Sequence, residues 1–111
     1  MRILIVDDEP TVRRTNARVL RAQGHEVTVA ESGLAALTAV ATEPRFDLVV
    51  TDLEMQGMSG NELAQSLAAM QYPARRLCIT SRDANFVRLD LFTGHLTKPH
   101  TAGQLVAFVQ G

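Results

Sequence analysis

Two short runs decide the fold of this chain: Arg2–Asp8 (RILIVDD) and Asp47–Asp52 (DLVVTD). Each run has an apolar centre rich in β-branched residues, which is typical of a strand buried on both faces. Such strands belong to parallel sheets whose two faces are covered by helices. Because both runs end in aspartate, the sequence also predicts carboxylates at one edge of the sheet.

Strand and helix signals alternate along the rest of the chain. Further strand-like stretches are Glu26–Ala30, Leu77–Thr80 and Leu96–Thr97, the last being the middle of a short fifth strand. Helix signals between the strands are Pro10 and Gly24 at the ends of the first helix, Ser32 before the second, and capping boxes at Ser59–Glu62 and Thr101–Gln104. In the helix after Ser59 we expect Leu63, Leu67 and Met70 to face inward.

This order of elements predicts an α/β fold with one parallel sheet, right-handed crossovers and helices on both faces. Residues 82–93 leave one element open, because alternation of Val87, Leu89 and Leu91 suits a strand while the same letters can form a short helix. No repeat, linker or low-complexity segment is visible. We therefore expect a single domain over residues 1–111.

Composition narrows the class of protein. A net charge of −1 favours neither a nucleic-acid binder nor a membrane-surface binder, and the apolar runs are too short to cross a bilayer. Cys78 is the single cysteine, so it has no partner for an internal disulfide, and we expect a buried reduced thiol. A reduced thiol and the absence of a signal peptide suit a cytoplasmic protein.

Ligand-binding residues of such sheets gather beyond the carboxyl ends of the strands. Those positions are Asp7–Asp8, Asp52, Thr80–Ser81 and Lys98. Three converging carboxylates repel one another unless a cation lies between them, and oxygen ligands favour Mg²⁺ over zinc. A carboxylate beside a metal, a cation and a hydroxyl can act as a nucleophile toward phosphorus.

Lys98 stands out because the chain has ten arginines and only this one lysine. Chance alone can produce this. The alternative is that a compact ammonium on a flexible stem does what a planar guanidinium cannot do at that position.

Together these residues make the chain resemble the receiver domain of two-component response regulators over its whole length. The motifs that carry the resemblance are Ile3–Pro10 (ILIVDDEP), Asp52–Gly60 (DLEMQGMSG), Thr80 and Lys98–Pro99. Each motif alone is weak, but their order and their places at strand ends make the set specific. The resemblance implies a three-layer flavodoxin-like fold with a five-stranded sheet of order 2-1-3-4-5.

The resemblance also implies the roles of the site residues. Asp52 would be the phosphoacceptor, Asp8 a direct Mg²⁺ ligand, Asp7 a ligand through water, and the Glu54 carbonyl a further ligand. Thr80 and Lys98 would contact the phosphoryl group, with a cis peptide between Lys98 and Pro99. The donor would be a phosphohistidine on a histidine kinase or a histidine phosphotransfer protein. We expect a signalling module rather than a metabolic enzyme, without nucleic-acid or membrane contact, as a monomer or weak dimer.

Several positions depart from the family pattern. His95 stands where a switch aromatic is usual, either as a planar switch residue that responds to pH or as an edge-strand residue without a special role. Ser81 stands where Ala or Gly is usual and should modestly narrow the access of phosphate. Gln56 replaces a proline, which should make that loop less rigid. We hypothesise that Glu54 and Arg82 pair across the mouth of the site and hinder attack by water. The segment between Thr80 and Lys98 is short, so the fourth helix should be shortened or irregular.

Other interpretations stay open. A pseudo-receiver would share the fold and act only by protein contact, and a phosphatase of the haloacid dehalogenase type also combines an aspartate nucleophile with Mg²⁺. Arg13, Arg14, Arg18 and Arg21 should lie on the outward side of the first helix, as a solvated face or a docking site for an acidic helix. We interpret His25 and His100 as structural or solvent-facing.

Overall fold

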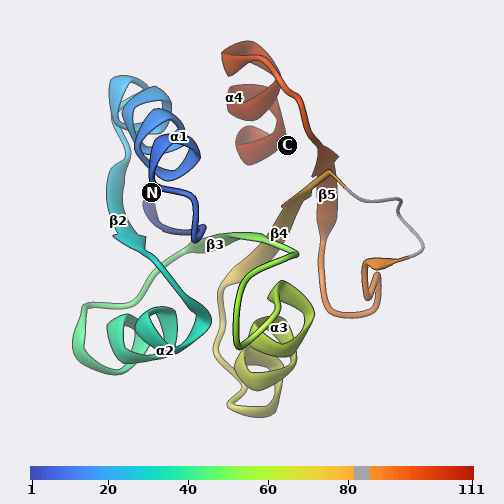
Figure 1. Cartoon of the computed structure of the whole chain (residues 1–111). Coiled ribbons are helices and arrows are strands. Elements are labelled where there is room, and N and C mark those ends of the chain that lie inside the picture. Colours follow the sequence, from blue (N-terminus) through green and yellow to red (C-terminus); the bar gives the residue numbers. More distant parts are fainter. Residues whose placement is uncertain (82–85) are drawn as a thin grey trace.

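The computed structural model describes residues 1–81 and 86–111. Its centre is a sheet of five parallel strands in the order β2-β1-β3-β4-β5 (Figure 1). The strands are β1 (Arg2–Val6), β2 (Glu26–Ala30), β3 (Leu48–Asp52), β4 (Arg75–Thr80) and β5 (Gly94–Thr97). The predicted fold class and strand order are therefore confirmed, and Asp52 is the last residue of β3 rather than the first residue after it.

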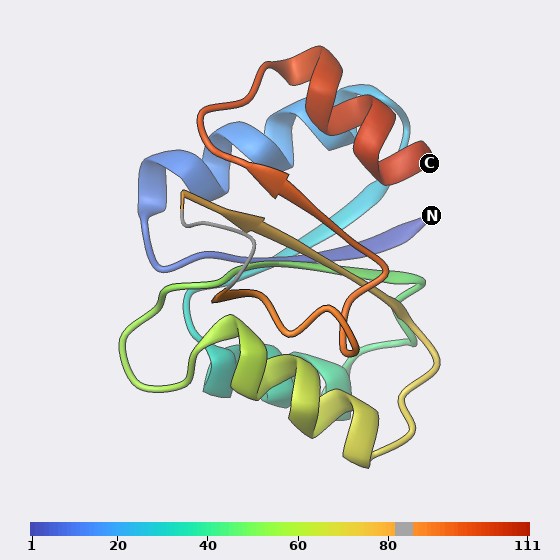
Figure 2. The ribbon, with the colours of Figure 1, turned by 90° about the vertical axis from the view of Figure 1, so that its right-hand side faces the viewer.

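In the described part of the chain, four helices cover the two faces of the sheet. They are α1 (Pro10–Ala22), α2 (Gly33–Thr42), α3 (Gly60–Ala69) and α4 (Ala102–Gln110). Helices α1 and α4 lie on one face, and α2 and α3 on the other, so the molecule has three layers (Figure 2). Within residues 1–81 and 86–111, none of the helices is long and apolar enough to cross a bilayer.

The alternation of side chains along β1 divides the core between these layers. Ile3 and Ile5 pack beneath α1 and α4, while Leu4 and Val6 pack beneath α2 and α3. All four side chains are at most 2% exposed. Burial on both faces explains why this run shows no polar alternation in the sequence.

The predicted helix boundaries rest on identifiable contacts. Ser32 Oγ accepts from the Ala35 N–H, and the capping boxes of Ser59 with Glu62 and Thr101 with Gln104 are both formed. Gly24 follows α1 with φ +89°, a conformation that favours glycine. The inward placement of Met70 was wrong, because this side chain is 53% exposed at the end of α3.

The connection between β4 and β5 contains the element that the sequence left open. Residues 87–93 run as turns and bends rather than as a strand or an α-helix, and residues 82–85 lie outside the described part. Val87, Leu91 and Phe92 are nevertheless buried, and they pack with Cys78 beside α3. The Arg76 side chain donates to the Leu91 carbonyl at 2.7 Å, so a polar contact helps to hold the segment in place.

Gly60 fixes how closely α3 approaches the end of β3. Its N–H donates to the Leu53 carbonyl at 2.8 Å. A Cβ at this position would meet the carbonyl oxygen of Asp52 and would lie 2.9 Å from Leu53 Cα, both of which are backbone atoms. The loop that follows Asp52 therefore depends on a residue without a side chain.

Replacing Gly60 by Ala should lower the free energy of unfolding by about 1–3 kcal/mol, because the backbone of β3 must move to make room. Gly103→Ala is the matched control, since the nearest atom to a Cβ there is Thr101 Oγ1 at 3.9 Å. That variant should be as stable as the wild type or slightly more stable. Urea unfolding measures both, and equal stabilities would contradict the close approach at Gly60.

Candidate functional site

Three carboxylates meet at the carboxyl edge of the sheet. Asp7 and Asp8 follow β1, and Asp52 ends the neighbouring strand β3, whose Thr51 pairs with Val6. One oxygen from each carboxylate lies within 4.8 Å of the others. Asp7 is 3% exposed, whereas Asp8 is exposed, so the cluster runs from the protein interior to the solvent.

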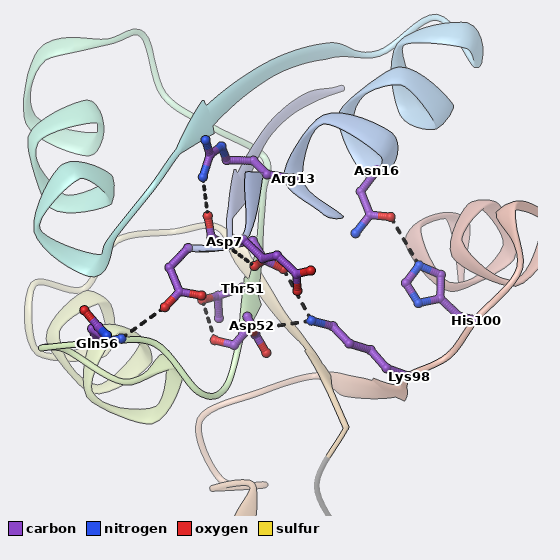
Figure 3. Close-up of polar contacts among 10 residues, drawn as sticks. Asp7, Arg13, Asn16, Thr51, Asp52, Gln56, Lys98 and His100 are labelled. Carbon is purple, nitrogen blue, oxygen red and sulfur yellow. Dashed lines mark hydrogen bonds and ion pairs between the residues drawn. The ribbon is translucent and has the colours of Figure 1, made fainter. Parts of the chain in front are cut away.

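Lys98 reaches two of these carboxylates from the end of β5. Its Nζ lies 3.4 Å from Asp7 Oδ2 and 3.4 Å from Asp52 Oδ2 (Figure 3). The Lys98 N–H donates to the Thr80 carbonyl at 2.8 Å, which continues the pairing of β5 with β4. The peptide bond to Pro99 is cis, as predicted.

Burial and the neighbouring Lys98 charge act in opposite directions on the Asp52 carboxylate. Burial raises the pKa of Asp52, and the Asp7 charge adds to this, while Lys98 and a hydrogen bond from the Glu54 backbone oppose it. Burial also tends to lower the pKa of Lys98, but Asp52 and Asp7 outweigh it, so that pKa is raised. The metal-free site therefore holds more negative charge than one ammonium can balance.

The carboxylates fit a hard divalent cation in both charge and donor type. Asp7 Oδ1 accepts from the Glu9 N–H at 2.9 Å, and its Oδ2 faces Lys98. Asp8 Oδ2 accepts from the Gln56 N–H at 3.2 Å. Among the described residues, the other Asp8 oxygen accepts no hydrogen bond, which suits Asp8 as the more direct ligand of the two.

The remaining predicted residues lie around this cluster. Thr80 is fully buried beneath it, Ser81 and Glu54 are exposed, and His95 is half-buried on β5 opposite Cys78. Arg82 lies outside the described residues. The pairing of Glu54 with Arg82 and the modulating roles of Ser81 and His95 stay predictions.

Two supporting contacts were missed in the sequence. Arg13 donates to the Asp7 carbonyl at 2.8 Å and is half-buried, so its assignment to the outward stripe of α1 was wrong. The loop at Gln56 is held to Asp8 through a backbone N–H that a proline would lack. A backbone donor carries no signal in the side-chain pattern, which is why the sequence did not reveal it.

A third missed contact joins α1 to the start of α4. His100 Nε2 lies 3.2 Å from Asn16 Oδ1, and Asn16 is only 5% exposed. His100 is half-buried, so of the two alternatives the structural one applies. Helical spacing places Asn16 on the inward side of α1, but it does not indicate the partner of its side chain.

Comparison with known proteins places this geometry in a family. The family model described as the response regulator receiver domain matches residues 3–110. The chain belongs to the response regulator receiver domain family. This assignment confirms the resemblance that the motifs indicated.

Individual relatives agree with the assignment. The receiver domain is 37% identical over 112 residues to the DNA-binding response regulator MtrA of Mycolicibacterium smegmatis, which covers 98% of this chain and 49% of MtrA. It is 34% identical over 117 residues to the sensor histidine kinase GacS of Pseudomonas protegens, which covers 97% of this chain and 13% of GacS. The chain thus spans about half the length, or less, of the curated relatives that it matches.

A solved structure agrees at the level of the fold and the sequence. The response regulator TrrA from Thermotoga maritima, determined in complex with Mg²⁺-BeF, is 30% identical and superposes with a TM-score of 0.89. The match covers 98% of this chain and 96% of TrrA.

Asp52→Asn should stabilise the metal-free receiver domain at neutral pH. Because burial raises the pKa of Asp52, the folded state binds its proton more tightly than the unfolded chain does. The wild type therefore loses stability as the pH rises from the ordinary pKa of an Asp through the raised pKa of Asp52. The Asp52→Asn variant does not lose it, because its amide carries no charge. The expected gain grows with pH and vanishes below about pH 3.

Thermal unfolding in a chelator between acid and neutral pH measures this difference. Asp90→Asn is the control, since Asp90 is an exposed partner of Arg88 and its pKa is lowered. That variant should gain nothing at neutral pH. A neutral-pH midpoint for Asp52→Asn below that of the wild type would contradict a destabilising effect of the buried Asp52 charge.

Proposed function

We propose that this receiver domain takes a phosphoryl group onto Asp52 from a phosphohistidine donor, with Mg²⁺ bound beside it. The observation that carries the proposal is the position of Lys98 Nζ, 3.4 Å from the carboxylates of both Asp7 and Asp52. An ammonium placed between a prospective metal ligand and a prospective nucleophile can contact the oxygens of an incoming phosphoryl group. A purely structural ion pair needs only one of these carboxylates.

The proposed transfer balances in atoms and charge. A carboxylate oxygen of Asp52 forms a bond to phosphorus while the phosphorus–nitrogen bond of the donor breaks. The electron pair stays on the imidazole nitrogen, which takes up a proton. Lys98 and the Thr80 hydroxyl would bind phosphoryl oxygens, so the protein's task is positioning and charge balance.

Asp7, Asp8, Asp52 and the Glu54 carbonyl would hold the metal. Bound Mg²⁺ supplies positive charge that offsets both the carboxylates and the phosphoryl oxygens. The TrrA structure is that of a complex with Mg²⁺-BeF, and this supports such a site here by similarity.

The proposed donor is a histidine kinase or a histidine phosphotransfer protein. Support comes from GacS, whose name is that of a sensor histidine kinase and whose chain contains a region similar to this one. We propose a single-turnover acceptor whose phosphoryl group is later lost to water, rather than an enzyme that turns over a metabolite. The proposed location is the cytoplasm.

Acetyl phosphate with Mg²⁺ should add one phosphoryl group to the wild-type domain, which intact-protein mass spectrometry detects. Asp52→Asn should remain unmodified, because the amide is not a nucleophile toward phosphorus. Asp90→Asn, the same substitution at a remote exposed pair, should be modified at the wild-type rate.

The other outcomes separate the alternatives. An unmodified wild type would favour a pseudo-receiver that acts by protein contact alone. Continuous release of phosphate over many turnovers would favour a phosphatase. Modification of Asp52→Asn at the wild-type level would place the acceptor elsewhere.

A further inference from the structure

The Lys98–Pro99–His100 stretch carries a polar contact that the proposed chemistry does not use. The Lys98 backbone is fixed on one side, where its N–H donates to Thr80, and α4 is fixed on the other side by the capping box of Thr101. Between these two points, His100 Nε2 approaches Asn16 Oδ1 on α1 at 3.2 Å (Figure 3). We call these two side chains the Asn16–His100 pair.

Close packing does not fix this stretch against α1. A hollow of about 480 Å³ opens between the helix and the stretch, and Thr15, Ser81 and Pro99 are among the residues that line it. A loop beside open space is free to shift unless specific contacts hold it, because only dense packing transmits position without them. The hydrogen bond of the Asn16–His100 pair is such a contact.

The pair is directional and partly buried. With Asn16 Oδ1 facing the ring, Nε2 carries the proton and donates. His100 Nδ1 is buried, and no group among the described residues lies within hydrogen-bonding distance of it. Burial, together with the Lys98 charge, lowers the pKa of His100, which favours the neutral ring with a single donor. A buried Asn side chain that loses its partner costs stability, so the pair favours one position of the loop.

Helix α1 also contacts the end of β1, on the other side of the site from Lys98. Arg13, three residues before Asn16, donates to the Asp7 carbonyl at 2.8 Å. The same two turns of α1 therefore contact the strand end that carries the prospective metal ligands and the loop that carries Lys98. Their relative position sets the distance between Asp7 and the Lys98 ammonium.

We propose that the Asn16–His100 hydrogen bond positions Lys98 against Asp7 and Asp52, which makes His100 a positioning residue for phosphoryl binding. This inference rests on the proposed function, since Lys98 is assigned there to the phosphoryl oxygens. It predicts a separation of effects: loss of the pair weakens binding of a phosphoryl-like anion and leaves Mg²⁺ binding nearly intact, because Asp7, Asp8 and Asp52 do not move.

The single lysine of the chain permits a direct test. A protein grown with lysine that carries ¹³C at Cε gives one side-chain signal, that of Lys98. The signal is recorded for the wild type and three variants. His100→Leu removes the donor, His100→Gln keeps an N–H at the position of Nε2, and the double variant Asn16→Leu/His100→Leu removes both polar groups. His25→Gln is the control, because His25 precedes β2 at the opposite edge of the sheet.

His100→Leu and the double variant should shift the Lys98 signal. Both should also weaken binding of beryllofluoride at saturating Mg²⁺ by about fivefold, the change that loss of one net hydrogen bond produces. Mg²⁺ affinity should change by less than about twofold. His100→Gln and His25→Gln should match the wild type in all three measurements.

The double variant separates position from stability. Replacing both polar partners by apolar groups should restore most of the stability that His100→Leu loses, while the Lys98 signal stays shifted. If the double variant instead recovers the wild-type signal and anion affinity, the pair serves stability alone and the proposal is wrong. It is equally wrong if His100→Gln behaves like His100→Leu, or if Mg²⁺ and anion affinities fall together.

Failure of the proposed function gives a different result. A wild type that binds Mg²⁺ but takes up no beryllofluoride would overturn the phosphoryl role of the site, and the role of the pair in phosphoryl binding with it. A wild type that binds both, with variants that bind equally well, would overturn only the inference about His100.

Discussion

Repulsion among Asp7, Asp8 and Asp52 is the constraint on which this structure depends. The parallel pairing of β1 with β3 brings their acidic ends together, so the sheet that forms the core also places the three carboxylates close to one another. Lys98 offsets part of this repulsion from β5, yet burial still raises the pKa of Asp52. Bound Mg²⁺ would supply the missing positive charge, both for the carboxylates and for the oxygens of an incoming phosphoryl group.

Most of the fold could be predicted from local signals. The buried run Ile3–Val6 identified a central strand, and capping boxes at Ser59 and Thr101 located two helices within about one residue. The β4–β5 connection could not be predicted, because its apolar residues suit either period. Met70 shows a second limit of the prediction. Helical spacing indicates which side of the helix a residue lies on, but not where along its length the helix extends beyond the core.

The convergence of site residues was predictable, but the contacts that support them were only partly so. Asp7, Asp52 and Lys98 could be predicted as site residues from their positions at strand ends, because a parallel sheet brings those ends together. Arg13 was predicted to face the solvent from its position on the helix. That position does not show that the long side chain turns back to donate to the Asp7 carbonyl. The Asn16–His100 pair joins residues 84 positions apart, and no local pattern could have paired them.

Mg²⁺-dependent stability measures whether the three carboxylates bind a metal ion. The free energy of unfolding should rise with Mg²⁺ in the wild type, by about 1.4 kcal/mol for each tenfold increase above the dissociation constant. Asp8→Asn should remove most of this gain, since it deletes the carboxylate with an oxygen left for the metal. A wild type that gains nothing from Mg²⁺, or an Asp8→Asn variant that gains as much as the wild type, would contradict the account.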